Sequence, residues 1–468
     1  MPLTKSPRPH LGSALPLASL VALLVAGCGG QMSSQSQAVT YHKDVAPILQ
    51  EHCQGCHSPG RLAHFSLTSY AQAKGAAALM VREVKAGRMP PWNARSTPEC
   101  QPRFGWQDDT RLPAAATATL ERWLAAGTPE GDPKEAPALR APPPDDLPGM
   151  TMELQPQQPF KSSGERDQFI CFVMDPKLTQ PGYFNGWHFV AGNKEVVHHA
   201  LMFTNPDGAA RKKANAEGWF DCFANPGVEA QLIGAWAPGS VPAVLPPNIA
   251  TTLKPGSLLV MQIHYHPAGR DLAADSTKFQ MRFIKASPEW QLTTSLVGNA
   301  GKYDAKTGDG LQPDAKGVAE FRIPAGESAK EIKQVFTIPD KINGTPTPDL
   351  RIYSVGTHMH YVGRDMKIEI DRAAPRGGDP KNECLIQTPE WDFNWQRWYV
   401  YDTSIDQLPR AGAGDKLKMR CTYDNSLGNP KLVAALAEEK LAQPREVRLG
   451  ESTLDEMCLG VFGAIYRP

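Results

Sequence analysis

The sequence has no excess of charge of either sign. Its 468 residues contain 49 Lys and Arg against 49 Asp and Glu, so the formal net charge is zero. Nucleic-acid binding needs a basic patch or stripe, and a solvating tail needs a run of acidic residues. The composition therefore gives no support for a nucleic-acid partner. Hydrophobic residues make up 41% of the chain, which excludes a disordered protein and is enough for two to four domains with ordinary cores.

The sequence also lacks an apolar run of membrane length. Its longest apolar run, Ala14 to Ala26, is shorter than the about 20 residues that span a bilayer. Lys5 and Arg8 precede this run and Val25-Ala26-Gly27-Cys28 ends it, a pattern typical of an export signal. One interpretation of this pattern is an ordinary secretory signal that contains a cysteine; the other is a signal whose cysteine is acylated. The chain after the signal is expected to be soluble and to lie outside the cytoplasm.

The final four residues of this signal resemble the lipobox of bacterial lipoproteins, whose cysteine is acylated. The resemblance implies that residues 1–28 are a lipoprotein signal peptide and that Cys28 carries the lipid. Contact with the membrane would then be through the lipid anchor only. We expect a protein of the cell envelope that faces the periplasm or the cell exterior. Gly29 after the cysteine favours the outer membrane.

Cysteine usage agrees with an oxidising compartment. Nine cysteines are present, of which Cys28 is assigned to lipid and Cys53 and Cys56 to the motif described next. The even remainder suggests disulfides, although six cysteines allow 15 pairings and the sequence does not choose among them. The six are Cys100, Cys171, Cys222, Cys384, Cys421 and Cys458.

Residues 53–57 carry a haem-attachment signature. They read Cys-Gln-Gly-Cys-His, the C-x-x-C-H pattern in which two thioethers hold the porphyrin and the adjacent imidazole reaches the iron. We expect one covalently bound haem c on Cys53 and Cys56, with His57 as an axial ligand. The alternative is a zinc or redox C-x-x-C site.

Met89 is the expected second axial ligand of this haem. It follows an amphipathic stretch, Tyr70 to Ala86, and a thioether opposite histidine suits electron transfer. His64 is the rival ligand, and a structural methionine is the other alternative. With a closing helix at Ala114 to Ala126, the segment 39–132 resembles a small all-α cytochrome c domain. A proline-rich linker, residues 133–150, ends it.

Beyond the linker, short alternating apolar runs are separated by Gly, Pro and Asn, and helical stretches are few. Leu258 to His264 and Leu417 to Cys421 are examples. This spacing favours antiparallel β-sandwiches, and the length suggests two of them, residues 151–290 and 291–468.

Six of the twelve histidines fall in three pairs in this region. One pair is adjacent, and the other two have the form H-x-H, in which a strand points both imidazoles to the same face. Each H-x-H is therefore a ready-made metal chelate, although a single histidine in a strand is more often a core residue. The pairs are His198 and His199, His264 and His266, and His358 and His360.

The order of these motifs resembles a known family. Val-His-His-x-Leu-x-Phe, Gln-Ile-His-Tyr, His-x-His and finally Asp455-Glu456-Met457-Cys458 resemble the copper type II, ascorbate-dependent monooxygenases, which include peptidylglycine alpha-hydroxylating and dopamine beta-monooxygenases. The resemblance covers roughly residues 151–468. It implies a multidomain protein in which a small all-α cytochrome c domain is followed by two all-β antiparallel jelly-roll sandwich domains.

The resemblance also implies two copper ions with different ligands. His198, His199 and His264 look like an electron-transfer copper site. His358, His360 and Met457 look like the oxygen-binding, catalytic site, where a soft thioether favours Cu(I). A Cys421 to Cys458 disulfide and a supporting role for Gln262 follow from the same pattern. His266 has no counterpart there, and is either a supporting residue or an alternative to His264.

The sequence departs from the peptide-amidating branch of that family. The positions that hold the peptide carboxylate there are Gly356, Leu459 and Val461 here. Without that charged clamp, we expect a small neutral or apolar substrate and no peptide amidation.

The expected activity is a copper-dependent monooxygenase reaction, in which one oxygen atom of dioxygen enters a substrate C–H bond and the other becomes water. An external electron donor would act through the haem. No nucleophile motif or carboxylate pair is apparent, and hydrogen abstraction needs none. The alternatives are a non-catalytic haem and copper electron-transfer or copper-binding lipoprotein, and a haem–copper enzyme that reduces nitrite or peroxide.

Overall fold

The computed structural model describes most of the chain after the expected signal peptide. The expected acylation site Cys28, the rival haem ligand His64 and the middle of the proline-rich linker lie outside the described residues. No helix in the described part of the chain is long and apolar enough to cross a membrane. The described residues are 38–59, 61, 63, 65–138, 146–163, 167–222, 225–237, 240–266, 271–342, 345–452 and 454–468.

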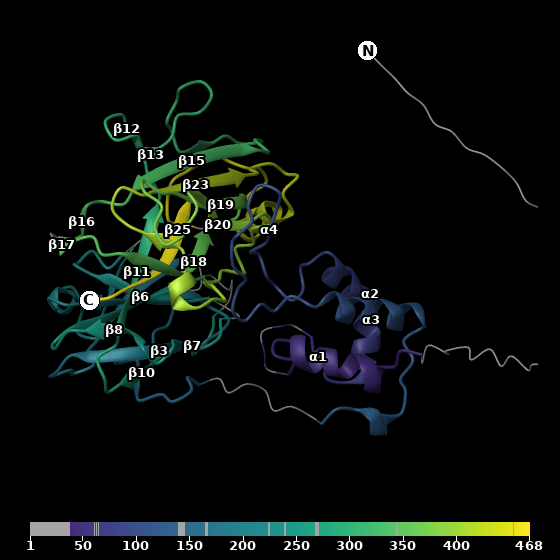
Figure 1. Cartoon of the computed structure of the whole chain (residues 1–468). Helices are drawn as coiled ribbons and strands as arrows, with labels where there is room; N and C mark the ends of the chain where they lie inside the picture. The colour runs from purple at the N-terminus through teal and green to yellow at the C-terminus, as the bar shows by residue number, and fades with distance from the viewer. Residues whose placement is uncertain are drawn as a thin grey trace, which may run out of the picture. The chain divides into compact units, whose positions relative to one another are not determined.

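The helices of the N-terminal part pack on one another (Figure 1). Their shared core includes Leu49, Ala73 and Trp123, all fully buried. Ser69 begins the longest helix with a capping box, because its side chain accepts from the Gln72 backbone while the Gln72 side chain accepts from the Ser69 backbone. The elements are η1 (Tyr41–Val45), α1 (Ala46–His52), α2 (Tyr70–Lys85), α3 (Ala114–Ala125) and η2 (Pro133–Glu135).

Between α2 and α3 the chain leaves the helices and joins the β-sheets. Cys100 forms a disulfide with Cys384, 284 residues further along the chain. The Arg95 N–H donates to the Gln387 carbonyl at 3.0 Å, and the Gln107 N–H donates to the Val400 carbonyl at 2.8 Å. We call residues 92–107 the strap. One disulfide and several backbone hydrogen bonds attach the strap to the sheets.

The prediction of a small all-α cytochrome c domain is therefore wrong. The described chain is mostly β-sheet with four α-helices, none longer than 16 residues, and residues 39–468 form one compact unit. The physical reason lies between the two helical patterns. The helix ends at Lys85, where Gly87 follows the C-cap with a positive φ, and the strap buries Trp92, Ala94 and Trp106 in the core of the β-sheets.

The largest sheet has eight strands in one path and two further strands beside it. The path runs β1, β10, β3, β8, β11, β25, β18, β21, with β7 beside β3 and β22 beside β18. The strands are β1 (Met152–Leu154), β3 (Gly182–Val190), β7 (Ala243–Val244), β8 (Ile249–Leu253), β10 (Lys278–Ile284), β11 (Trp290–Gly298), β18 (Leu350–His358), β21 (Tyr399–Val400), β22 (Arg410–Ala411) and β25 (Leu459–Tyr466).

Two more sheets supply the remaining long strands (Figure 1). The five-stranded sheet consists of β5 (Trp219–Asp221), β2 (Gln168–Met174), β9 (Leu258–Tyr265), β4 (Val197–Asn205) and β6 (Gln231–Trp236). The six-stranded sheet consists of β12 (Tyr303–Asp304), β13 (Asp309–Leu311), β15 (Lys330–Thr337), β23 (Lys416–Tyr423), β19 (Gly363–Asp371) and β20 (Asn382–Thr388).

Short elements complete the fold. Two pairs of very short strands and three short helices connect the longer strands. They are β14 (Arg322–Ile323) with β24 (Val447–Arg448), β16 (Lys341–Ile342) with β17 (Thr345–Pro346), η3 (Ala209–Lys212), η4 (Ile405–Gln407) and α4 (Pro430–Glu438).

β11 joins the two halves of the largest sheet. It pairs in parallel with β8, through Trp290 with Ile249, and antiparallel with β25 along its whole length. β11 begins at the predicted boundary between the two sandwich domains, residue 290, so one sheet continues across it. The β-sheets are compatible with the predicted antiparallel sandwiches, and the two halves share a sheet.

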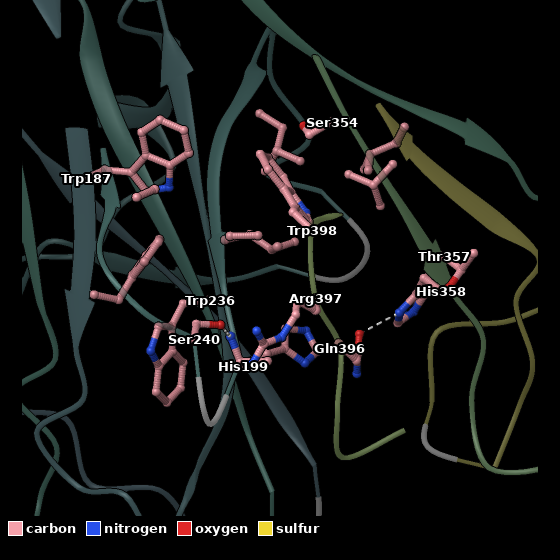
Figure 2. A pocket seen from close by; sticks show the side chains of 18 of the residues that line it. Trp187, His199, Trp236, Ser240, Ser354, Thr357, His358, Gln396, Arg397 and Trp398 are labelled. Carbon is pink, nitrogen blue, oxygen red and sulfur yellow. Dashed lines mark hydrogen bonds between the residues drawn. The ribbon is translucent and has the colours of Figure 1, made fainter. Parts of the chain in front are cut away.

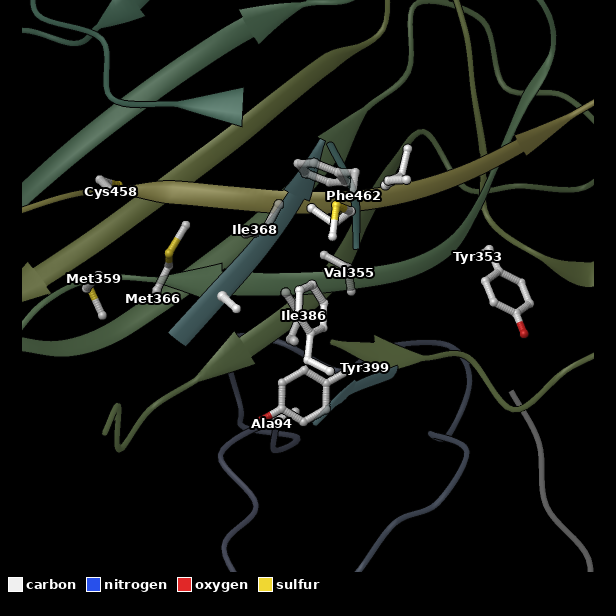
Figure 3. Packing of buried hydrophobic residues seen from close by; sticks show 14 of the residues in the cluster. Ala94, Tyr353, Val355, Met359, Met366, Ile368, Ile386, Tyr399, Cys458 and Phe462 are labelled. Atoms are coloured by element: carbon white, nitrogen blue, oxygen red, sulfur yellow. The ribbon is translucent and has the colours of Figure 1, made fainter. Parts of the chain in front are cut away.

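One large core lies among these sheets. Alternate residues of β23, such as Met419 and Cys421, are buried, as expected for a strand with one face on the core. Val355, Ile368 and Phe462 pack in the same cluster, and Ala94 of the strap joins it (Figure 3). The core thus combines segments from the whole length of the β-region with part of the N-terminal segment.

Candidate metal centres and cavity

β4 and β9 bring three histidines together, which we call the three-histidine group: His198, His199 and His264. His199 lies opposite His264 in the β4–β9 pairing, and a register irregularity falls between Val197 and His199. In a regular strand the adjacent His198 and His199 would face opposite ways, so this bulge allows both to point to one place. One ring nitrogen from each of the three histidines lies within 4.8 Å of the other two.

The three-histidine group offers nitrogens that suit a metal ion. The Nδ1 atoms of His198 and His199 lie 3.1 Å apart. His264 Nε2 lies 2.9 Å from Asp167 Oδ1, while His264 Nδ1 is buried with no hydrogen-bond partner among the described residues. Burial, followed by the neighbouring His264 charge, holds the pKa of both His198 and His199 well below the usual value. These two rings are therefore neutral, as metal ligation requires.

Asp167 links His264 to His266. Its Oδ1 lies 2.9 Å from His264 Nε2 and 2.9 Å from His266 Nδ1. A carboxylate that accepts from the far nitrogen of a ligating imidazole fixes its tautomer and orientation. Asp167, His264 and His266 also form a second group of possible ligand atoms within 4.8 Å of one another. His266 therefore either supports the three-histidine group through Asp167 or belongs to that second group.

Replacing Asp167 with asparagine is expected to weaken copper binding at the three-histidine group. The asparagine keeps the shape but loses the negative charge that holds His264, and such changes typically lower metal affinity about 10–100-fold. Competition titration with a copper chelator measures the affinity. Asp271→Asn is the control, because the Asp271 side chain is 81% exposed and pairs with Lys161 at the surface. Equal affinities in the two variants would show that Asp167 does not act on His264.

β18 and the residues after it carry His358 and His360, which we call the histidine pair. Their ring centroids lie 5.2 Å apart. His358 Nδ1 lies 2.7 Å from Gln396 Oε1, and His360 Nδ1 lies 3.0 Å from the Asp455 carbonyl oxygen. Each ring thus has its Nδ1 in a hydrogen bond, the reverse of His264, in which Nε2 is the bonded nitrogen.

Burial also keeps the histidine pair uncharged. It lowers the pKa of His358 to about 4 and that of His360 to about 3. Both imidazoles are therefore neutral at physiological pH, as a metal ligand must be.

Strand pairing brings Met457 towards the histidine pair. His358 pairs with Leu459, two residues after Met457, in the β18–β25 ladder. Met457 is 5% exposed and lines the same cavity as both histidines. The Tyr423 hydroxyl donates to the Met457 carbonyl at 2.7 Å, and the next residue, Cys458, forms a disulfide with Cys421. That disulfide is the pairing that the family resemblance implied.

Glu456 fastens Met457 to the segment that carries the histidine pair. Its Oε2 accepts from the backbone N–H groups of His360 at 2.9 Å and Met457 at 3.0 Å. Its Oε1 accepts from the N–H groups of Val362 at 3.0 Å and Gly363 at 3.2 Å. Burial raises the pKa of Glu456 to about 8, and the four amides act against that shift. Glu456 is a positioning residue for both His360 and Met457.

Phe393 lies between the three-histidine group and the histidine pair. Its ring stacks on His198, with centroids 4.7 Å apart and an interplanar angle of 22°, and meets His360 at 5.4 Å. Trp391, two residues earlier, donates from Nε1 to the His360 carbonyl at 3.1 Å. One aromatic ring therefore separates an imidazole of the first group from an imidazole of the second.

A cavity of about 470 Å³ connects the two groups. His199 reaches it from the three-histidine group, and the histidine pair and Met457 reach it from the other side. Figure 2 shows Gln396, Arg397 and Trp398 of one loop lining it with Trp187 and Trp236. A ligand in this cavity would therefore lie against both groups and against a largely apolar wall that includes several tryptophans.

The predicted haem-attachment residues lie beside the helical core. Cys53 and Cys56 are free thiols, whereas the six other described cysteines form three disulfides. His57 Nδ1 lies 3.1 Å from the Phe65 carbonyl oxygen, which leaves Nε2 free for iron. Burial lowers the pKa of His57. The residue types suit a haem c, in which two cysteines form thioether links to the porphyrin and an imidazole ligates the iron.

Met89 packs on the same helical core as Cys53. The remaining disulfide, Cys171 with Cys222, adjoins the three-histidine strands, since Gln262 Nε2 lies 3.5 Å from Cys222 Sγ. Gln262 is buried and lines the cavity.

Sequence reasoning missed several residues that shape the two groups. Asp167 gave no signal, because it lies 97 residues from His264 in the chain and in no motif. Glu456 stood within the quoted Asp-Glu-Met-Cys sequence but received no role. The loop from Trp391 to Trp398 reads W-D-F-N-W-Q-R-W, and its density of aromatic residues was the one signal available.

Comparisons with known proteins do not establish a family. No protein-family model and no curated protein sequence matches the chain. Among solved structures, peptide-N(4)-(N-acetyl-beta-D-glucosaminyl) asparagine amidase is 10% identical, with 67% of this chain and 96% of that chain covered and a TM-score of 0.25. The recombinant peptide: N-glycanase F is 10% identical, with 68% and 99% covered and a TM-score of 0.25. The major capsid protein P2 from bacteriophage PM2 is 8% identical, with 64% and 98% covered and a TM-score of 0.21. These likenesses are too weak to carry an argument about fold or function.

Proposed function

We propose that this chain is a copper-dependent monooxygenase that hydroxylates a substrate C–H bond with dioxygen. The observation that carries the proposal is the cavity between two groups of buried or half-buried histidines. The three-histidine group offers imidazoles alone, whereas the histidine pair shares its side of the cavity with the thioether of Met457. Two unlike ligand sets on one cavity suit two copper ions with different tasks.

Bound copper would supply one-electron redox chemistry and the activation of dioxygen. The chain's own residues would hold and orient the reactants. The neutral imidazoles of the three-histidine group and the histidine pair ligate without displacing a proton from nitrogen. Asp167, Gln396 and Glu456 fix the rings and the Met457 backbone. The tryptophans of the cavity wall exclude water from an apolar substrate.

Cys53 and Cys56 would hold a haem covalently, and His57 Nε2 and Met89 would ligate its iron. Bound there, the haem would supply electron transfer from an external donor. A histidine–methionine pair suits electron transfer. Cys28 would anchor the protein by lipid in the cell envelope, facing the periplasm or the exterior.

Metal analysis and isotope labelling test this function. The purified full chain should contain two copper ions and one covalent haem. After reduction in the presence of ¹⁸O₂ and a set of aromatic and aliphatic compounds that fit the cavity, mass spectrometry should find one labelled oxygen atom in a product. The same protein with His360→Ala is the control and should give no labelled product. A chain that binds both copper ions and haem but labels none of the compounds would instead be an electron-transfer lipoprotein.

A further inference from the structure

One wall of the cavity comes from the strap, and it presents an unpaired donor. Trp92 lines the cavity and is 2% exposed. Its indole Nε1 is buried and has no hydrogen-bond partner among the described residues. Buried indole N–H groups normally find an acceptor, because leaving one unpaired costs the hydration that it had in the unfolded chain. Because Trp92 also lines the cavity, we take a bound ligand as the source of the missing acceptor.

A cation lies directly on Trp92. The guanidinium of Arg397 sits over the Trp92 ring, 5.2 Å from its centroid, and Arg397 lines the same cavity. Within the described chain, Arg397 forms no salt bridge and its side chain makes no hydrogen bond. Its charge lowers the pKa of Asp109, but the Asp109 carboxylate is bonded to Arg111 at 2.9 Å and 3.0 Å. The guanidinium thus keeps its donors free.

The rest of the described cavity lining contains no second lysine or arginine. Among the described residues that line the cavity, Arg397 is the sole lysine or arginine, and most of the others are apolar or aromatic. Two carboxylates also line it. Asp108 raises the pKa of Tyr353, after the larger effect of burial, and burial followed by the Asp455 charge raises the pKa of Glu451 to about 7. Neither carboxylate is paired with Arg397. An anionic group would therefore be held at Trp92 and Arg397 and repelled by the acidic residues.

We propose that Trp92 and Arg397 form a subsite for a carboxylate, so that the substrate is an apolar, preferably aromatic molecule with one carboxylate group. The guanidinium supplies the charge and paired donors, and the indole supplies a further N–H. This inference rests on the proposed function and changes the substrate class, since the sequence predicted a neutral or apolar molecule and Arg397 calls for an anionic one. The carboxylate is held by residues outside the copper-ligand motifs, one of them in the strap.

A second source of the same chemistry is a propionate of the haem. Arg397 is close enough to Cys56 to lower the pKa of its thiol, although burial has the larger, opposite effect. A propionate of a haem attached there would also present a carboxylate. The two sources differ in one respect, because a propionate would occupy the subsite only when haem is attached. Comparing ligand binding to protein produced with and without covalent haem therefore distinguishes a substrate carboxylate from a haem propionate.

Ligand binding to the full chain tests the subsite. The probes are phenylalkanoates with one to four methylene groups and the corresponding amides, which have nearly the same size without the charge. Calorimetry should show that at least one carboxylate binds about 10–100-fold more tightly than its amide, as expected for a hydrogen-bonded ion pair. In Arg397→Gln the preference should fall to near one, and Trp92→Phe should weaken carboxylate binding several-fold while keeping the ring.

Arg467→Gln is the matched control. Arg467 also lies over a tryptophan, Trp290, at 4.8 Å, but it pairs with Glu289 and does not line the cavity. It should leave the preference unchanged. Arg397→Lys keeps the charge and should retain part of the preference, which separates lost binding from lost folding.

The outcomes of this experiment are separable from those of the proposed function. If no phenylalkanoate binds, or if amides bind as tightly as carboxylates with and without haem, the subsite does not exist. A preference seen only without haem assigns the subsite to a propionate and overturns the substrate assignment. Copper content is measured on the same samples, so a chain that prefers carboxylates yet binds no copper would contradict the proposed function alone.

Discussion

Replacing Met457 with alanine is expected to remove tight Cu(I) binding at the histidine pair and to leave the three-histidine group loaded. Met457 would supply the one thioether of the two ligand sets, and thioethers favour Cu(I). Loss of a direct ligand should exceed the about 10–100-fold effect of changes to supporting residues. X-ray absorption of the copper-loaded protein should lose its sulfur scattering, and incorporation of labelled oxygen should fall with it.

The control for this change is Met366→Ala. Met366 is fully buried in the core of the six-stranded sheet (Figure 3) and does not line the cavity. Both substitutions should lower the free energy of unfolding by about 2–5 kcal/mol, because each truncates a buried methionine. Only Met457→Ala should change Cu(I) affinity. Retained sulfur scattering in that variant would contradict the assignment of Met457 as a ligand.

Replacing Glu456 with alanine is expected to destabilise the protein by about 3–5 kcal/mol. The carboxylate accepts from four backbone N–H groups, and its loss leaves these buried donors unpaired. Urea unfolding of the metal-free protein measures the change. Copper binding at the histidine pair should weaken as well, because Glu456 joins the His360 and Met457 backbones.

Two further variants make this result specific. Glu456→Gln offers one acceptor oxygen in place of two, so it should lose about half of the stabilisation. Glu446→Ala removes an exposed carboxylate that pairs with Arg322 and Arg448, and it should change stability by less than about 1 kcal/mol. A stability of Glu456→Ala equal to that of Glu446→Ala would contradict the role given to Glu456.

Helical periodicity alone predicts the wrong fold for the N-terminal segment. The patterns at Tyr70 to Ala86 and Ala114 to Ala126 did predict α2 and α3. Their presence suggested an all-α domain, but the strap between them belongs to the β-sheets. Local patterns report which residues form helices, and they do not report what the residues between the helices pack against.

The sequence by itself determined the local chemistry of this protein. Two cysteines and a histidine in C-x-x-C-H, and two histidines in H-x-H, are close together in any helix or strand, because backbone geometry sets those separations. Only the tertiary structure decided which nitrogens stay free, since that depends on Asp167, Gln396 and Asp455 from distant segments. The tertiary structure also determines that Cys100 pairs with Cys384 and that Arg397 lies over the ring of Trp92. Such contacts join residues between 38 and about 300 positions apart, where no local spacing rule applies and packing of the whole core selects the partners.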